Sequence, residues 1–453
     1  MSLFTVLIGF LSLSAAHVIP PYKASHPDLP TNLHSRQAPS LKTGAWIINY
    51  KPADPALPTY RGPLRITSEG SETFISGDLY NGTVIPNPAD GSPVLPRKNY
   101  WAYVRASNLS PTNNGGFELG LEFYRFWGFK TQGYSNVSVW EMTSIPDVVS
   151  VPVVYNGGFN VTLSSAKAPT GFPDSANYFE GELRTADGKV DGTFSMGWVS
   201  KYVRKIKVEI LTATGVPVPL NDSRGVNMWK QAYEDVGFDI DVHVGKTDIP
   251  APNNPGLLPE QWKLHQQEAA VVEHRSSTNY DQEFKYCLLA VKKLEHTARG
   301  HVIDQIADFN SDPREGAAVA SEWIVGTYAD GKEDNSKPGR WPEAVKGKKF
   351  YELWDAYYRT ALHEVGHMFN IFHPDEFAND IMTDTDSFAD AGNESGTGKA
   401  FPENITPETF RFIAAHKYHM RHRPDTHVRP AMANIGAAVQ NEIPPANFGL
   451  PTA

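Results

Sequence analysis

The spacing of the apolar residues changes near Arg204, and this change constrains the fold more than any other feature of the sequence. From Gly44 to about residue 203, short runs of Val, Ile, Tyr, Phe and Trp alternate with turn residues, as is typical of an all-β domain. Beyond Arg204, strand spacing and helical spacing follow one another, which indicates an α/β unit. The sequence therefore predicts a multidomain α+β chain. An all-β sandwich or barrel at residues 43–203 is followed by an α/β domain at residues 204–425.

The β region also contains a hairpin pattern. Asp187-Gly188 separates the runs at 178–185 and 190–199, and Asp-Gly is favoured in two-residue hairpin turns. Some aromatic rings of this region could stack on sugars, although such rings more often fill a core. The rings in question are those of Tyr124, Trp127 and Trp140.

The α/β region divides into strands and helices of ordinary length. Trp229, Tyr233 and Val236 recur at helical spacing, and Gly237 suits the end of that helix. In full, the pattern predicts strands at 206–210, 238–244, 284–292 and 317–327, and helices at 226–236, 259–272, 349–369 and 406–419. The remaining residues, 426–453, are rich in Pro and Ala and are expected to form a loose tail.

The predicted helix at 349–369 contains two histidines four residues apart, in the segment His363-Glu-Val-Gly-His367. Residues four apart lie about 40° apart around a helix axis, so both imidazoles can reach one ion from the same side. Glu364 lies beside them, where it can serve a metal-bound water rather than the metal itself. A third imidazole, His373, follows six residues after His367.

A break in this helix is needed to bring His373 to the same ion. A continuous helix would rotate His373 by about 240° from His367. A residue with positive φ lets the chain turn back, and Asn370 is the best residue for this position after glycine. Pro374 then prevents helical continuation through His373.

The segment from His363 to Met382 resembles the metzincin metalloproteases. Their pattern is His-Glu-x-x-His-x-x-Gly-x-x-His followed by a methionine turn, and it is matched here except that Asn370 replaces the glycine. No tyrosine lies near Met382, unlike in astacin-like members, so the subfamily is unassigned. The order of strands and helices over residues 204–425 also resembles the metzincin catalytic domain.

The resemblance implies a zinc site with a defined set of ligands: His363, His367 and His373. Three neutral imidazoles leave Zn²⁺ with its full charge and an open position for water. Glu364 would act as the general base on that water, and Met382 would support the site from below. In this family an extended substrate pairs with an edge strand, for which residues 317–327 are the candidate. The predicted function is a zinc endopeptidase that acts on proteins or peptides.

Several alternatives stay open. Asp375 and Glu376 are rival third ligands, since snapalysin-like members use an acidic residue there. An acidic loop could hold calcium, although its spacing fits no EF-hand; its members are Asp384, Asp386 and Asp390. Three histidines of the last helix are expected to be solvated: His416, His419 and His422. The alternative function is a secreted binding protein, with carbohydrate as the candidate ligand and an inactive metzincin-like domain.

Charge and cysteine content exclude two further classes. The chain has 51 acidic and 41 basic residues, a net charge of −10, whereas nucleic-acid binders usually carry a basic patch. Cys287 is the single cysteine, which excludes an intrachain disulfide and a zinc site built from several cysteines. Its apolar surroundings predict a buried thiol.

The first residues indicate export from the cell. Residues 1–16 contain an apolar run with small residues before a cleavage point after Ala16, as in a signal peptide, and residues 17–42 read as a leader or linker. No later run is long and apolar enough to span a membrane, so we expect a secreted, extracellular protein with no stable membrane span. Seven Asn-x-Ser/Thr sequons agree with a secreted glycoprotein: Asn81, Asn108, Asn136, Asn160, Asn221, Asn393 and Asn404.

Overall fold

The computed structural model describes residues 41–432 and 450–451, apart from short stretches within that range. Those stretches are residues 71, 86, 126–128, 135–136, 143–152, 155–157, 255–258, 296–298, 304–311, 329–331, 335, 338, 375–376 and 395–398. The predicted signal peptide and most of the predicted leader lie outside the described residues. Residues 38–453 belong to one compact unit, which contains both predicted folded regions.

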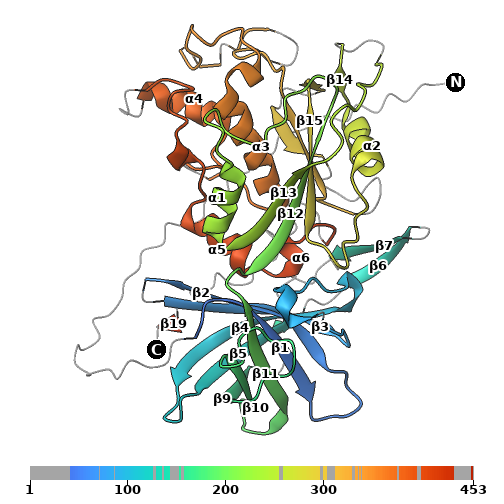
Figure 1. Cartoon of the computed structure of the whole chain (residues 1–453), viewed down its shortest axis with the longest axis vertical. Helices are drawn as coiled ribbons and strands as arrows, with labels where there is room; N and C mark the ends of the chain where they lie inside the picture. Colours follow the sequence, from blue (N-terminus) through green and yellow to red (C-terminus); the bar gives the residue numbers. More distant parts are fainter. Residues whose placement is uncertain are drawn as a thin grey trace, which may run out of the picture. The chain divides into compact units, whose positions relative to one another are not determined.

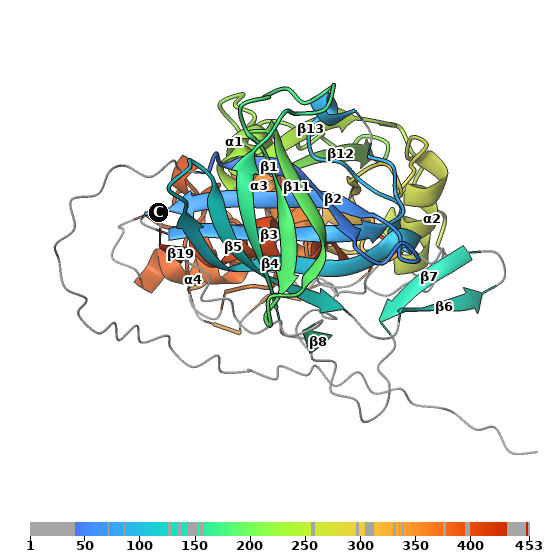
Figure 2. The same cartoon turned by 90° about the horizontal axis from the view of Figure 1, so that it is seen from below.

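Eight antiparallel strands of the N-terminal region close into a barrel (Figures 1 and 2). In chain order they are β1 (Gly44–Pro52), β2 (Tyr60–Glu69), β3 (Glu72–Asn81), β4 (Tyr100–Pro111), β5 (Phe117–Arg125), β9 (Phe159–Ser165), β10 (Tyr178–Thr185) and β11 (Val190–Ser200). Each strand pairs with the next in this series, and β11 pairs with β1 to complete the ring. The predicted all-β region is confirmed, and it is a barrel rather than a sandwich.

The inward face of the barrel packs a core of aromatic and aliphatic side chains. Trp46, Tyr50 and Phe123 are among its largest members, and each is at most 2% exposed. Because side chains alternate between the faces of a strand, β3 contributes Ile75 and Leu79 to this core, whereas Phe74, Ser76 and Asp78 lie on its opposite face. Burying a side chain of this size contributes about 1.5–3 kcal/mol, so packing holds the barrel together.

Four short strands lie beside the barrel strands. β6 (Phe129–Tyr134) and β7 (Val137–Met142) pair with each other, and Figure 2 shows this hairpin beside the barrel. β8 (Val153–Val154) pairs with β5, and β19 (Leu450–Pro451) pairs with β3. Of the aromatic residues considered for sugar stacking, Tyr124 is buried, while Trp127 and the side chain of Trp140 lie outside the described residues.

The second region is built on a five-stranded mixed sheet. Its order is β13 (Phe238–Val244), β12 (Arg204–Thr212), β15 (Lys285–Val291), β18 (Gly316–Ala320) and β17 (Gly300–Val302). The first four strands are parallel, and β17 runs antiparallel to β18. Two further short strands, β14 (Gln261–Trp262) and β16 (Lys293–Leu294), pair with each other.

The expectation that residues 317–327 form an edge strand is wrong. In the structure β18 lies between β15 and β17, and β17 is the outer strand of the sheet among the described residues. All five residues of β18 are buried, as expected for a strand that is covered on both sides. β17 has only three residues, which is too few to give a recognisable alternating pattern in the sequence.

Six α-helices accompany this sheet among the described residues. They are α1 (Met228–Val236), α2 (Leu264–His274), α3 (Trp354–Met368), α4 (Thr385–Glu394), α5 (Ala414–His422) and α6 (Asp425–Val428). Short 3₁₀ turns lie at Pro88–Asp90, Arg97–Asn99, Phe350–Glu352 and Pro407–Thr409. In Figure 1, α1 and α3 lie on one side of the sheet and α2 on the other. Within this part of the chain, no helix is long and apolar enough to cross a membrane.

The bounds of α1 follow local sequence chemistry, whereas other predicted helices begin later than expected. The Asn227 side chain caps α1 by accepting from the Lys230 backbone N–H (3.2 Å), and Gly237 ends the helix with φ 94°. The helix predicted at 259–272 starts only at Leu264, and Gln261–Trp262 is a strand. The helix predicted at 406–419 instead begins as a 3₁₀ turn, and α5 starts only at Ala414. The backbone N–H of Ile413, which precedes α5, is taken by the buried Asp380 carboxylate (3.3 Å).

The end of the described chain packs on the outward face of the barrel. The rings of Phe74 in β3 and Tyr418 in α5 meet edge to face with centroids 5.5 Å apart. The Tyr80 hydroxyl of β3 donates to Asp425 at the start of α6 (2.6 Å). Residues 426–432, which we expected to begin a loose tail, are therefore buried.

A buried set of charges joins the barrel to the second region. The Arg65 guanidinium lies 2.6 Å from the Asp78 carboxylate and 3.6 Å from that of Asp425, and Arg204 of β12 also pairs with Asp425. All four side chains are at most 5% exposed. Removing one member of such a cluster leaves an uncompensated buried charge, which typically costs about 3–5 kcal/mol.

Candidate metal centre

Helix α3 ends where the sequence predicts its break. Its last residue is Met368, and Asn370 has φ 64°, in the left-handed region. The Asn370 backbone N–H bonds to the carbonyl of His367 (2.8 Å), which closes the last turn. The chain then reverses direction, so the segment that follows runs back toward α3 and carries His373 with it.

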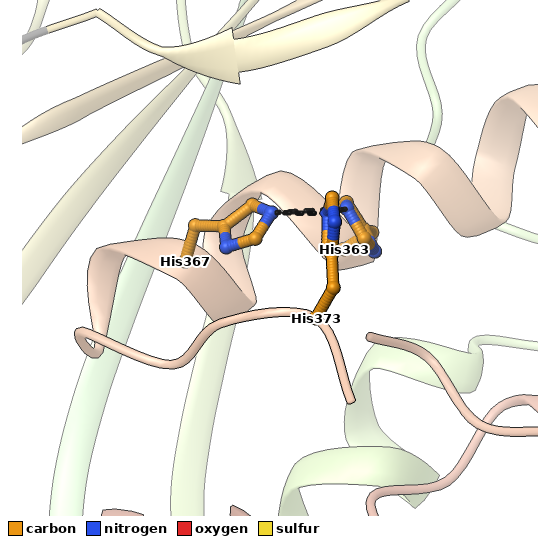
Figure 3. Close-up of side chains that lie close together, drawn as sticks. All are labelled: His363, His367 and His373. Atoms are coloured by element: carbon orange, nitrogen blue, oxygen red, sulfur yellow. Dashed lines mark hydrogen bonds between the residues drawn. The ribbon is translucent and has the colours of Figure 1, made fainter. Parts of the chain in front are cut away.

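The three predicted ligand histidines converge on one point. Their Nε2 atoms are 3.0–3.1 Å apart in all three pairs. Figure 3 shows two of the rings coming from α3 and the third from the loop that follows it. His363 is buried, His367 is half-buried and His373 is exposed, so the group is open to solvent on the His373 side.

Hydrogen bonds at the other ring nitrogen fix the tautomers of two of these histidines. Nδ1 of His363 contacts the carbonyl of Ile381 (2.7 Å), and Nδ1 of His367 contacts the carbonyl of Ile371 (2.7 Å). A carbonyl only accepts, so each Nδ1 must be the donor, and a neutral imidazole has a single N–H. Both Nε2 atoms therefore present lone pairs to each other at 3.0 Å, an arrangement that a shared cation stabilises.

The surroundings keep the histidines neutral. Burial, together with the neighbouring imidazoles, holds the pKa of His363 well below its usual value. Burial lowers the pKa of His367 to about 4, and it also lowers the pKa of His373. Metal ligands must be deprotonated, so these three rings are ready to bind near neutral pH.

The spacing of the three nitrogens suits a small divalent ion. The centre of the triangle that they form lies about 1.8 Å from each Nε2, which is shorter than the ~2.0–2.1 Å of a zinc–nitrogen bond. An ion of this size can therefore touch all three nitrogens at once. The triad can hold a metal ion, and the donor set of three imidazoles suits zinc and other late transition metals.

The side chain of Glu364 projects from α3 toward the outer strand β17. This side chain is 4% exposed, and burial raises its pKa to about 8, although Arg299 lowers it in part. Glycine at position 300 makes room for it, because a Cβ there would lie 2.4 Å from Oε1 of Glu364. A divalent cation nearby would favour the charged carboxylate.

Met382 lies directly beneath the helix turn that joins the first two histidines. A Cβ added at Gly366 would lie 2.3 Å from the Met382 sulfur, so the glycine of the His-Glu-Val-Gly-His segment lets the methionine approach the helix. Residues 381 and 382 form a turn, as predicted. The side chain of Met382 is fully buried.

Three side chains that hold this turn were not assigned a role from the sequence. Arg359, one helical turn before His363, donates to the carbonyls of Asp380 (2.5 Å), Ile381 (2.9 Å) and Thr383. The carboxylate of Asp380 accepts from the Thr383 backbone N–H and from His416. The only sign of this role in the sequence was an arginine on an otherwise apolar face of the helix. The carbonyls to which it donates could not be predicted from the sequence.

The other candidate groups have structural partners. Asp386 pairs with Arg299, and Asp390 with Arg340, and both lie in α4 rather than in a solvated loop. Cys287 is buried in β15, as predicted. The rival ligands Asp375 and Glu376 lie outside the described residues.

The three histidines of α5 were expected to be solvated, and the structure contradicts this. His416 and His422 are buried, and each of the three has a hydrogen-bond partner in another element.

The chain matches no protein-family model and no curated protein.

Proposed function

We propose that this chain is a secreted zinc-dependent endopeptidase of the metzincin type. The convergence of three imidazole Nε2 atoms, with a buried glutamate in the same helix, is the observation that supports this function. The left-handed Asn370 and the methionine packed under Gly366 agree with the metzincin resemblance of the sequence.

Each residue of the site has a distinct role in this proposal. His363, His367 and His373 hold the ion, which when bound would supply a Lewis acid that polarises the peptide carbonyl and lowers the pKa of a water molecule. Glu364 would take the proton of the water whose oxygen bonds to the carbonyl carbon, and would give that proton to the amine nitrogen as the peptide C–N bond breaks.

The substrate would bind along the outer strand of the second sheet. β17 lies beside Glu364, since a Cβ added at Gly300 would lie 2.4 Å from that side chain. An extended peptide that pairs with β17 would therefore pass the catalytic glutamate. The proposed substrate-pairing strand is therefore β17, residues 300–302, in place of residues 317–327.

Metal content and hydrolysis measured on the same preparations test this function. The wild-type chain should hold one zinc ion and cleave a broad peptide library. Glu364→Gln should keep the zinc but lose about 10²- to 10⁴-fold in rate, because the general base is gone. His367→Ala should lose the zinc, whereas Glu343→Gln, at a glutamate whose side chain is 86% exposed, should behave as wild type.

One result would favour the alternative function. If the wild-type chain holds zinc, cleaves no peptide and cannot be distinguished from Glu364→Gln, the site is not a peptidase centre. The protein would then be a binding protein with an inactive metzincin-like domain.

A further inference from the structure

Helix α5 contacts the metal centre at two points and the barrel at a third. Its three histidines, His416, His419 and His422, are spaced three residues apart, so each is rotated by about 60° from the one before and they point toward different neighbours. Each of them bonds to a different element: the turn around Met382, the end of α3, and the barrel.

The first contact holds the turn that orients a metal ligand. Asp380 is fully buried, and its Oδ1 accepts from the backbone N–H (2.9 Å) and the hydroxyl (3.0 Å) of Thr383, which closes the turn. Its Oδ2 lies 3.0 Å from Nδ1 of His416. The next residue, Ile381, uses its carbonyl to accept the Nδ1–H of His363. The Asp380 carboxylate therefore holds the turn that carries the carbonyl bonded to that ligand ring.

The second contact holds the break in the active helix. Nε2 of His419 lies 3.0 Å from the carbonyl of Phe369, the residue immediately before the left-handed Asn370. This break directs the chain back toward α3 and brings His373 to the other two imidazoles. α5 thus supports both segments that complete the ligand set.

The third contact fixes α5 itself. Nε2 of His422 lies 2.7 Å from the Thr67 hydroxyl of β2, and Nδ1 lies 2.9 Å from the Ser76 hydroxyl of β3. The Tyr103 hydroxyl of β4 donates to the carbonyl of His422 (2.7 Å). Three neighbouring barrel strands therefore hold the last residue of the helix.

We propose that α5 is the positioning element of the metal centre, which orients His363 through the His416–Asp380 contact and takes its own position from the barrel through His422. The barrel is then a permanent support of the metal centre and not a separate module. This inference rests on metal binding by the three histidines, but it does not require peptidase activity.

The affinity of the full-length protein for Zn²⁺ alone, measured by competition with a chelator, tests the first contact. Residues that support a ligand ring typically contribute about tenfold to hundredfold to metal affinity, so His416→Ala should weaken binding by that factor. His416→Asn should restore most of it, because the asparagine amide can occupy the place of Nδ1–H. Lys417→Ala is the matched control, since Lys417 is on the same helix and pairs instead with Asp235 (2.5 Å).

The double variant Thr67→Val with Ser76→Ala tests the contact with the barrel. Both changes lie in the barrel, and we expect zinc affinity to fall and the zinc-induced rise in Tm to shrink. A purely structural role would lower the Tm of the zinc-free and zinc-bound forms equally and leave the affinity unchanged. Unchanged affinity in either His416→Ala or the double variant overturns the proposal.

The outcomes separate this inference from the proposed peptidase. Zinc binding without hydrolysis in the wild-type chain would remove the peptidase and leave the α5 test valid. A wild-type chain that binds no zinc would overturn both.

Discussion

Two glycines mark the closest approaches around the metal centre. Gly300 faces the carboxylate of Glu364, and Gly366 faces the sulfur of Met382; a Cβ at either position would lie within 2.4 Å of these atoms. No real Cβ tolerates such a distance, so a neighbouring group must move. Substitution of Gly300 therefore tests the position of Glu364, and substitution of Gly366 tests the packing of the turn that contains Met382.

Gly300→Ala should lower peptidase activity while leaving zinc affinity nearly unchanged. The new methyl group would displace the Glu364 carboxylate but would not touch the three imidazoles. We expect kcat/KM to fall by at least about tenfold, since a positioned general base contributes about 10²- to 10⁴-fold.

Gly316→Ala in the adjacent β18 is the matched control for this change. A Cβ there meets Val271 and Ile303 at 3.4–3.5 Å, which is ordinary contact, and activity should be retained. Equal losses in both variants would show that the sheet tolerates no added methyl group and that Glu364 is not specifically affected.

Helix α3 and the turn beneath it behave as one element. A glycine-to-alanine change inside a helix normally stabilises it by about 1 kcal/mol. Gly366→Ala should do the opposite, because overpacking against Met382 costs about 1–3 kcal/mol. Urea unfolding of the zinc-free protein should show the loss, and Met382→Ala should cost less stability in the Gly366→Ala chain than in the wild-type chain. Additive effects of the two changes would contradict the contact.

The elements that the sequence predicts well are those defined by local chemistry. The bounds of β13, the glycine after α1 and the positive φ of Asn370 each depend on a few neighbouring residues. Closure of the barrel depends on the pairing of β1 with β11, strands separated by well over a hundred residues. Alternating apolar residues specify strands but not their partners, so sandwich and barrel could not be distinguished.

The support of the candidate site could not be predicted for a similar reason. The three ligands and Glu364 lie within one short segment whose geometry follows from helix spacing. Asp380 and His416 meet across 36 residues, and His422 reaches Ser76 across 346. Such contacts depend on the tertiary fold, which no local pattern records. The error at β18 has another cause, because the true outer strand is too short to produce a pattern.

For the whole molecule, buried histidines predict loss of stability in acid. Burial holds the pKa values of His419 and His422 well below the usual value and lowers that of His427 to about 3. Below about pH 6.5 the unfolded chain takes up protons that the folded chain does not, so stability falls as the pH drops. Each such histidine contributes up to about 1.4 kcal/mol per pH unit.

Urea unfolding of the zinc-free protein at pH 7.5 and pH 5 checks this dependence. Burial raises the pKa values of Asp78 and Glu364, which acts in the opposite direction, but these two carboxyls are outnumbered by the histidines with lowered pKa values, which include the three of the metal centre. His422→Asn should reduce the dependence on pH, and His265→Asn, at an exposed position, should not. An unfolding midpoint that is the same at both pH values would contradict the prediction.

The pairing of Asp78 with the last helices also has a consequence for the order in which the protein is made. All eight barrel strands lie within the first 200 residues, so the ring can close while the rest of the chain is still on the ribosome. The charged side chains on its outward face stay uncovered for longer, because the Asp425 backbone N–H that bonds to Asp78 is separated from it by 347 residues. A product truncated before that point would carry a closed barrel with Arg65 and Asp78 uncovered. Synthesis must therefore pass residue 425 before the Arg65 and Asp78 side chains of the barrel can be covered.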